Sequence, residues 1–237
     1  MARKFSPLIR AVPTGGPGGI DVDFLSLLST ANRRRLLQNS RRALYPAGAI
    51  AYHSESPPTA FICDRGLVRA YLNVPDGRQA TLAYGRAHEL VGATTIARQA
   101  APVSVQVVVE SVLTTLDVAA VSDLARSEVE VMAAIATHLA ARVNDAFGVI
   151  AVRSLGNIRE RLAFDLLERA CQSQLSVGRL EVRATQADLA DSIGSAREVV
   201  ARALGGLRAD GMIETSRGLV RVVDPIRLAA IVRSFVM

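Results

Sequence analysis

The side chains best suited to molecular recognition are three charged residues near position 200, namely Arg197, Glu198 and Arg202. An arginine can donate two hydrogen bonds to guanine, and a glutamate can accept one from cytosine. The surrounding sequence predicts a helix, with these side chains projecting from its start and outer face. Such a helix can enter the major groove of double-stranded DNA with its first residues against the base edges. The trio therefore indicates sequence-specific contact with DNA.

Two short helices joined by a tight turn would position this trio. Thr185 can cap the first helix, and Asp188 suits its electropositive first turn. Gly194 can take the left-handed conformation that ends a helix, and Ser195 or the turn itself begins the second one. Seven apolar residues can pack inward: Leu189, Ile193, Val199, Val200, Ala203, Leu204 and Leu207. This layout predicts a helix-turn-helix, although two amphipathic helices of a plain bundle share it.

A hairpin is predicted directly after these helices. Two short β-prone runs in residues 212–223 flank the turn Ser216-Arg217-Gly218. A helix-turn-helix followed by a hairpin is a winged helix.

The motifs of this region carry a family resemblance. They are Gln186–Ala190, Ile193–Leu204, Leu207 and Gly211–Ile213. They resemble the DNA-binding domain of the cyclic-AMP receptor protein and fumarate-nitrate reduction regulator (Crp/Fnr) family of transcription regulators. The resemblance implies a partner in RNA polymerase as well as in DNA.

The resemblance also implies roles for single residues. The positions matching Arg197, Glu198 and Arg202 read bases, and the one matching Gln186 contacts phosphate. We add Thr185 and Ser195 to the expected DNA contacts. The sequence departs from the family at Ala196 and Val199, where many members carry Ser and Thr, so two hydroxyls that could contact the DNA backbone are missing.

Residues 45–116 show β-strand signals. Short apolar runs at 59–63, 67–72, 80–84, 103–109 and 113–116 alternate with turns. The expected turns are Pro46–Gly48, Asp64–Gly66, Pro75–Arg78 and Gly85. Many short strands with regular turns predict a β-roll or sandwich, and the segments Tyr45–Gly48, Gly66–Arg69, Asp76–Arg78 and Glu89–Gly92 match the family's cyclic-nucleotide-binding-like domain. Residues 22–44 are expected to be helical.

A long helix is expected next. Ser127 and Glu130 form a possible capping box, and an apolar seam of coiled-coil type is interrupted by Arg142. The seam residues are Met132, Ile135, Leu139, Ala146 and Val149. In the family this helix pairs with its twin in a homodimer, which would present two recognition helices to a palindrome. A lone amphipathic helix could instead pack on its own domain.

The expected fold class is α+β, with an antiparallel β-roll, a dimerisation helix and a winged helix-turn-helix. The expected divisions are a flexible arm at 1–20, a roll at 21–121, a helix at 122–155 and a DNA-binding domain at 156–237. Gly156 breaks the long helix, and Asn157 with Glu160 can cap the following one.

An effector is harder to predict. Glu89 matches the glutamate that holds the ribose of cyclic AMP, but no arginine stands at the matching phosphate position near 101–104, and Ala146-Phe147 replace hydroxyl residues that contact adenine. We expect this site to be lost. Two distant cysteines, Cys63 and Cys171, cannot hold an iron-sulfur cluster. His53, His88 and His138 are conceivable haem ligands, but an ordinary structural role is the simpler interpretation of each. No cofactor or metal is predicted.

The composition of the chain limits the classes of protein to which it can belong. The chain has 237 residues, a net charge of +6 and 50% hydrophobic residues. It shows no signal peptide, membrane-spanning run, nucleotide-binding loop or nucleophile motif, so we expect a cytoplasmic protein that is not an enzyme. An arginine cluster at residues 33–42 indicates either a second nucleic-acid or partner contact or a solvated helix face. The alternative function is a module that senses a small effector or haem and docks protein through its winged helix.

Overall fold

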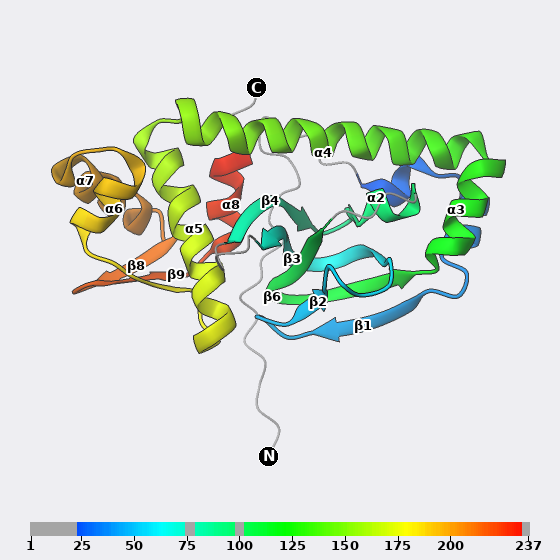
Figure 1. Cartoon of the computed structure of the whole chain (residues 1–237), viewed down its shortest axis with the longest axis horizontal. Coiled ribbons are helices and arrows are strands. Elements are labelled where there is room, and N and C mark those ends of the chain that lie inside the picture. Colours follow the sequence, from blue (N-terminus) through cyan, green and yellow to red (C-terminus); the bar gives the residue numbers. More distant parts are fainter. Residues whose placement is uncertain (1–22, 74–78, 98–101, 234–237) are drawn as a thin grey trace, which may run out of the picture.

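The structure is a computed structural model that describes residues 23–73, 79–97 and 102–233. The arm expected at 1–20 and the turn expected at Pro75–Arg78 lie outside these residues. An antiparallel sheet forms one end of the molecule, helices α5 to α8 with a small sheet form the other, and one long helix spans both (Figure 1).

The N-terminal sheet has six strands in the order β1-β6-β3-β4, with β2 paired to β6 and β5 paired to β3. Two long strands dominate it, because β3 and β6 pair along most of their length. The strands are β1 (Arg41–Tyr45), β2 (Ile50–Tyr52), β3 (Ala60–Asn73), β4 (Gln79–Arg86), β5 (Leu90–Val91) and β6 (Val103–Leu116). The prediction of antiparallel β-structure is confirmed, and the sheet does not close into a barrel.

The turn expected at Asp64–Gly66 is wrong. β3 continues through it as an irregularity in its pairing with β6. Gly66 has a φ of +115°, and a Cβ there would lie 2.1 Å from the Ser111 Oγ, so only glycine lets the two strands stay paired. The separate runs at 103–109 and 113–116 are likewise a single strand.

The helix expected over residues 22–44 is also wrong. The segment contains a short 3-10 helix, η1 (Phe24–Leu27), and helix α1 (Thr30–Leu36), and then joins the sheet as β1. Asn39 adopts a left-handed conformation with a φ of +61°, which stops the helical path. β1 then pairs with β6 from Arg41 opposite Thr115 to Tyr45 opposite Ser111.

A short helix, α2 (Ala93–Ile96), lies between β5 and β6. Three helices follow the sheet and lead to the C-terminal end: α3 (Val118–Ser127), α4 (Val129–Leu155) and α5 (Ile158–Val177). The capping box expected between Ser127 and Glu130 is absent, because Ser127 ends α3 and its Oγ donates to the Asp123 and Leu124 carbonyls. The Glu130 carboxylate instead accepts from the Ser29 amide at 2.5 Å and from Asn32. These hydrogen bonds, that of Asn32 first, lower the pKa of Glu130.

The break between α4 and α5 is as expected. Gly156 is the C-cap of α4, and Asn157 and Glu160 form a reciprocal capping box at the start of α5. The C-terminal elements follow: β7 (Glu181–Arg183), α6 (Gln186–Ile193), α7 (Arg197–Ala209), β8 (Ile213–Ser216), β9 (Leu219–Val222) and α8 (Pro225–Arg233).

One hydrophobic core joins the two ends of the molecule. Leu67, Tyr84 and Val108 of the large sheet belong to the same cluster as Leu166 and Leu207 of the C-terminal helices. Because α5 is shared between them, the C-terminal unit is packed against the sheet rather than tethered by a free linker.

Candidate nucleic-acid interface

The first helix of the predicted motif begins with a reciprocal cap. The Thr185 Oγ1 accepts from the Asp188 amide at 3.1 Å, and the Thr185 amide donates to the Asp188 carboxylate at 2.8 Å. Hydrogen bonds from Thr185, its backbone amide first, lower the pKa of Asp188. This confirms the local structure expected at Thr185 and fixes where α6 begins.

The turn at Gly194 sets the angle of the second helix. Gly194 has a φ of +62°, and the Ser195 amide donates to the Ala190 carbonyl at 2.9 Å. Ala196 is then the N-cap of α7 and offers no side-chain cap, so the turn rather than the Ser195 hydroxyl begins this helix.

Replacing Gly194 by alanine tests this turn. A Cβ at Gly194 would meet no atom within 4 Å, so the whole cost is the left-handed conformation, about 1–2 kcal/mol of unfolding free energy. Chemical denaturation measures it. Gly205 inside α7 has equally open space, and Gly205→Ala should be neutral or stabilising. Equal effects of both substitutions would contradict the role given to Gly194.

The packed faces of the two helices are those expected from their spacing. Five apolar side chains are buried: Leu189, Ile193, Val200, Leu204 and Leu207. Val199 and Ala203 are only partly buried. The opposite face of α7 is thereby left to solvent.

The predicted trio lies on that open face. Arg197, Glu198 and Arg202 are all exposed on α7. Within the part of the chain that the structure describes, none of them makes an ion pair or a side-chain hydrogen bond, so their donors and acceptors are free for a ligand. Thr185 and Gln186 are exposed at the start of α6, whereas Ser195 is half-buried in the turn.

The predicted hairpin is present beside these helices. β8 and β9 pair antiparallel, and β7 adds a third strand in the order β7-β9-β8. The hairpin turn exposes Arg217, a cation that the sequence pattern marked only as a turn residue. An exposed arginine at the tip of a hairpin is suited to a phosphate contact, so its residue type and its place in the turn were the signals from which the sequence could have marked it as a candidate.

These elements define a winged helix-turn-helix domain, the architecture of a DNA-binding protein. Residues 160–231 match the family model described as the Crp-like helix-turn-helix domain. The transcriptional regulator LdrP of Thermus thermophilus is 28% identical over 186 residues, covering 78% of this chain and 91% of that protein.

Solved structures give the same assignment of fold. A putative transcriptional regulator of the Crp/Fnr family from Eubacterium rectale superposes with a TM-score of 0.56 at 21% identity, covering 87% of this chain and 96% of that one. FixK2 from Bradyrhizobium japonicum gives a TM-score of 0.51 at 19% identity, covering 81% and 96%. The C-terminal domain therefore belongs to the Crp-like helix-turn-helix family, and the resemblance inferred from its motifs is confirmed.

Glu89, which the sequence matched to a cyclic-nucleotide site, is bound by side chains and backbone of the protein itself. Glu89 is buried, and both of its carboxylate oxygens accept from Arg142 of α4, at 3.0 and 3.1 Å. The Arg86 amide also donates to Glu89, at 2.9 Å. Arg142 therefore faces its own sheet, and the Glu89 carboxylate already has a cationic partner.

The candidate haem and redox residues are dispersed. His53 and His88 are exposed, while His138 is buried with its ring edge-on to Phe24 at 5.9 Å. Among the described residues, no cluster of three or more His, Cys, Asp or Glu could hold a metal. Burial raises the pKa of Cys63 and of Cys171 to about 12, so these free thiols are not reactive thiolates at neutral pH.

The arginine cluster at residues 33–42 is mostly engaged within the chain. Arg33 donates to the Leu25 carbonyl, Arg35 pairs with Glu128 and Arg42 pairs with Asp64. These contacts favour the interpretation of a solvated surface.

No described helix is both long and apolar enough to cross a bilayer.

A buried polar cluster, which the sequence did not reveal, joins the sheet to α5. We name its five members the interdomain polar cluster: Arg69, Thr81, Gln106, Glu168 and Gln174. The Glu168 carboxylate accepts from the Thr81 amide at 3.0 Å and hydroxyl at 3.1 Å, and lies 3.7 Å from Arg69. Gln106 accepts from Arg69 at 2.6 Å and donates to Gln174 at 3.1 Å.

Proposed function

We propose that the protein is a homodimeric regulator that binds a palindromic DNA site through α7 and does so without cyclic AMP. The observation that carries the proposal is the unpaired trio on the open face of a winged helix. Arg197, Glu198 and Arg202 would read base edges, and Thr185, Gln186 and Ser195 would hold the phosphate backbone. The half-buried position of Ser195 favours a contact through its backbone amide.

The exposed surface of α4 supports dimerisation. Besides the terminal residues Val129 and Leu155, four large apolar side chains of α4 are exposed: Met132 (47% exposed), Val143 (51%), Phe147 (58%) and Ile150 (61%). With Ala136 and Leu139 they form a stripe of 3- and 4-residue spacing, which we name the α4 stripe. A stripe of this length exposed on one helix is typical of a protein interface.

The α4 stripe differs from the seam expected from the sequence. Met132 and Leu139 belong to both, but Ile135 is 2% exposed in the core of its own subunit, and Val149 packs beside Val152 and Phe164. Arg142 turns inward to Glu89, so it does not interrupt the stripe. The interface that we propose is therefore rotated by about one residue around the helix.

The ion pair between Glu89 and Arg142 supports a degenerate sensor. A ribose hydroxyl would have to displace a partly buried guanidinium that makes two hydrogen bonds to Glu89. The phosphate of the nucleotide would add a negative charge for which no cation partner has been identified. We keep the proposed division into a roll (21–121), a dimerisation helix (122–155) and a DNA-binding domain (156–237). RNA polymerase as partner and a cytoplasmic location are proposed from the family alone.

Arg197→Ala tests the proposed base contact. It should weaken binding to the preferred DNA site by about 1–3 kcal/mol and relax the preference at one base pair. Arg34→Ala is the matched control, because Arg34 is an exposed arginine on α1, distant in the chain from the winged helix. Quantitative footprinting measures both. Unchanged affinity and base preference in Arg197→Ala would overturn the assignment.

Salt dependence separates DNA binding from the alternative of protein docking. Neutralised phosphates release counterions, so log affinity should fall steeply and linearly with log salt concentration. A flat salt dependence together with failure of polyanions to compete would favour a winged helix that docks protein.

A further inference from the structure

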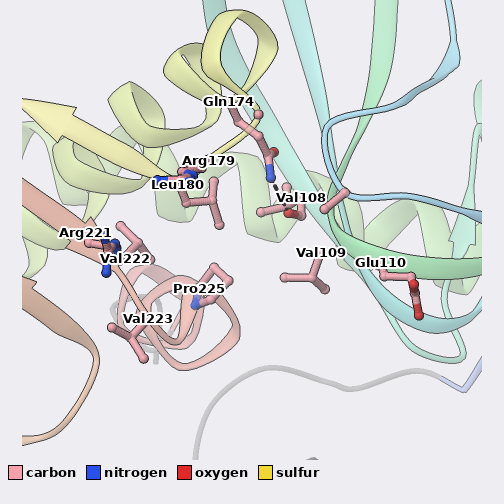
Figure 2. A pocket seen from close by; sticks show the side chains of 12 residues that line it. Val108, Val109, Glu110, Gln174, Arg179, Leu180, Arg221, Val222, Val223 and Pro225 are labelled. Atoms are coloured by element: carbon pink, nitrogen blue, oxygen red, sulfur yellow. Dashed lines mark hydrogen bonds between the residues drawn. The ribbon is translucent and has the colours of Figure 1, made fainter. Parts of the chain in front are cut away.

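A cleft lies between the large sheet and the wing (Figure 2). Its volume is about 540 Å³, within the range of small-molecule sites. Most of its lining comes from three segments distant in sequence: residues 108–110 of β6, residues 178–180 after α5, and residues 221–223 with Pro225, from β9 into α8. Ala47 and Gln174 complete the lining. A ligand in this cleft would touch the sheet and the DNA-binding domain at once.

The floor of the cleft is apolar. Val108, Val222 and Pro225 are buried there, and Leu180 is partly buried. The one amide in the floor, Gln174, donates to the Val108 carbonyl at 2.8 Å, shown dashed in Figure 2. Because this amide is already satisfied, the floor favours an apolar body over a polar one.

The rim of the cleft has one uncompensated charge. Arg221 lies between the carboxylates of Glu181 and Glu214, at 3.2 and 3.3 Å, and Glu110 lies 3.5 Å from Arg65. Arg179 is exposed and, within the described residues, has no carboxylate or other side-chain partner. The free guanidinium is suited to a carboxylate at one end of an apolar ligand.

We propose that this cleft binds a small carboxylate with an apolar chain, the chain on the valine floor and the carboxylate at Arg179. Such a ligand contacts both units, so it binds better to the docked arrangement and shifts the population toward it. The site itself does not depend on the proposed DNA-binding function. Only its regulatory consequence, a change in DNA affinity, rests on that function.

Methyl NMR of the full-length protein, titrated with octanoate, tests the proposal without DNA. Resonances of Val109, Leu180 and Val222 should shift, and the dissociation constant should be about tenfold lower than for octan-1-ol, which lacks the charge. Heptanoate should bind about fourfold more weakly than octanoate, because it buries one methylene fewer.

Two variants localise the effect. Arg179→Gln should remove the preference for octanoate over octan-1-ol, whereas Arg183→Gln, an exposed arginine outside the lining of the cleft, should keep it. Val223 lines the cleft and is 50% exposed, so Val223→Trp should fill the space and abolish binding of both compounds without unfolding the chain.

Several results would overturn the proposal. They are no shift of the cleft methyls, the same preference in Arg179→Gln, or shifts confined to Val143 and Ile150 of the α4 stripe. Each would leave the proposed DNA binding intact. Conversely, if the cleft methyls respond to octanoate but the protein binds no DNA, the ligand site is supported and only the proposed function is refuted.

Discussion

Glu168→Ala is expected to lower the free energy of unfolding by about 3–5 kcal/mol, the largest single effect that we predict. Arg69 lies in the sheet and is 0% exposed, and the substitution removes the carboxylate that faces it from α5. The substitution also removes the side-chain acceptor of the Thr81 amide. An uncompensated buried charge is far more costly than a lost surface pair.

Chemical denaturation measures this loss of unfolding free energy, and two further variants serve as controls. Asp165→Ala breaks the i,i+4 pair of Asp165 with Arg169 on the same helix, which is partly exposed and should contribute less than about 1 kcal/mol. The double variant Arg69→Met with Glu168→Leu replaces both charges by apolar groups and should recover most of the stability. A loss in Glu168→Ala no larger than in Asp165→Ala would show that the interdomain polar cluster does not hold the units together.

Substituting glutamate at Phe147 and Ile150 is expected to convert the proposed dimer to monomers. Each side chain buried at an interface contributes about 1.5–3 kcal/mol, and twofold symmetry counts every substitution twice. Charges facing each other across the interface add repulsion. Affinity for a palindrome should fall together with dimerisation, because a single recognition helix reads only one half-site.

Sedimentation equilibrium measures the self-association. Thr137→Glu is the matched control, since Thr137 is exposed on α4 but lies outside the α4 stripe. A dimer that survives the substitutions at Phe147 and Ile150, or that is lost equally in Thr137→Glu, would contradict the interface.

The helix-turn-helix was predictable because its signals are local. The cap at Thr185 and the left-handed Gly194 involve residues only a few positions apart, and the structure has both. The predictions that were wrong also rested on local signals, but there the structure is determined by contacts with residues distant in the sequence. Residues 41–45 joined the sheet because β6 offered a strand for pairing, and Glu130 found Ser29, 101 residues away, instead of Ser127.

Distant partners also explain why the sequence did not predict the contacts around Glu89. In the sequence, Arg142 interrupts an apolar seam without an evident reason. Its partner, Glu89, lies 53 residues earlier and is identified only in the structure. The interdomain polar cluster combines residues of three strands with residues of α5. The spacing of residues within any one of these elements does not predict the cluster. Sequence alone could therefore predict the fold class and the helix-turn-helix, but not how the two units are joined.

Footprinting on a random-sequence DNA pool, without ligand and then with excess cyclic AMP or cyclic GMP, tests the central claim most directly. We predict one palindromic site bound equally in all three conditions, because Arg142 already occupies the Glu89 carboxylate. Protection that requires a cyclic nucleotide, or binding with no palindromic preference, would contradict a dimeric regulator with a degenerate sensor.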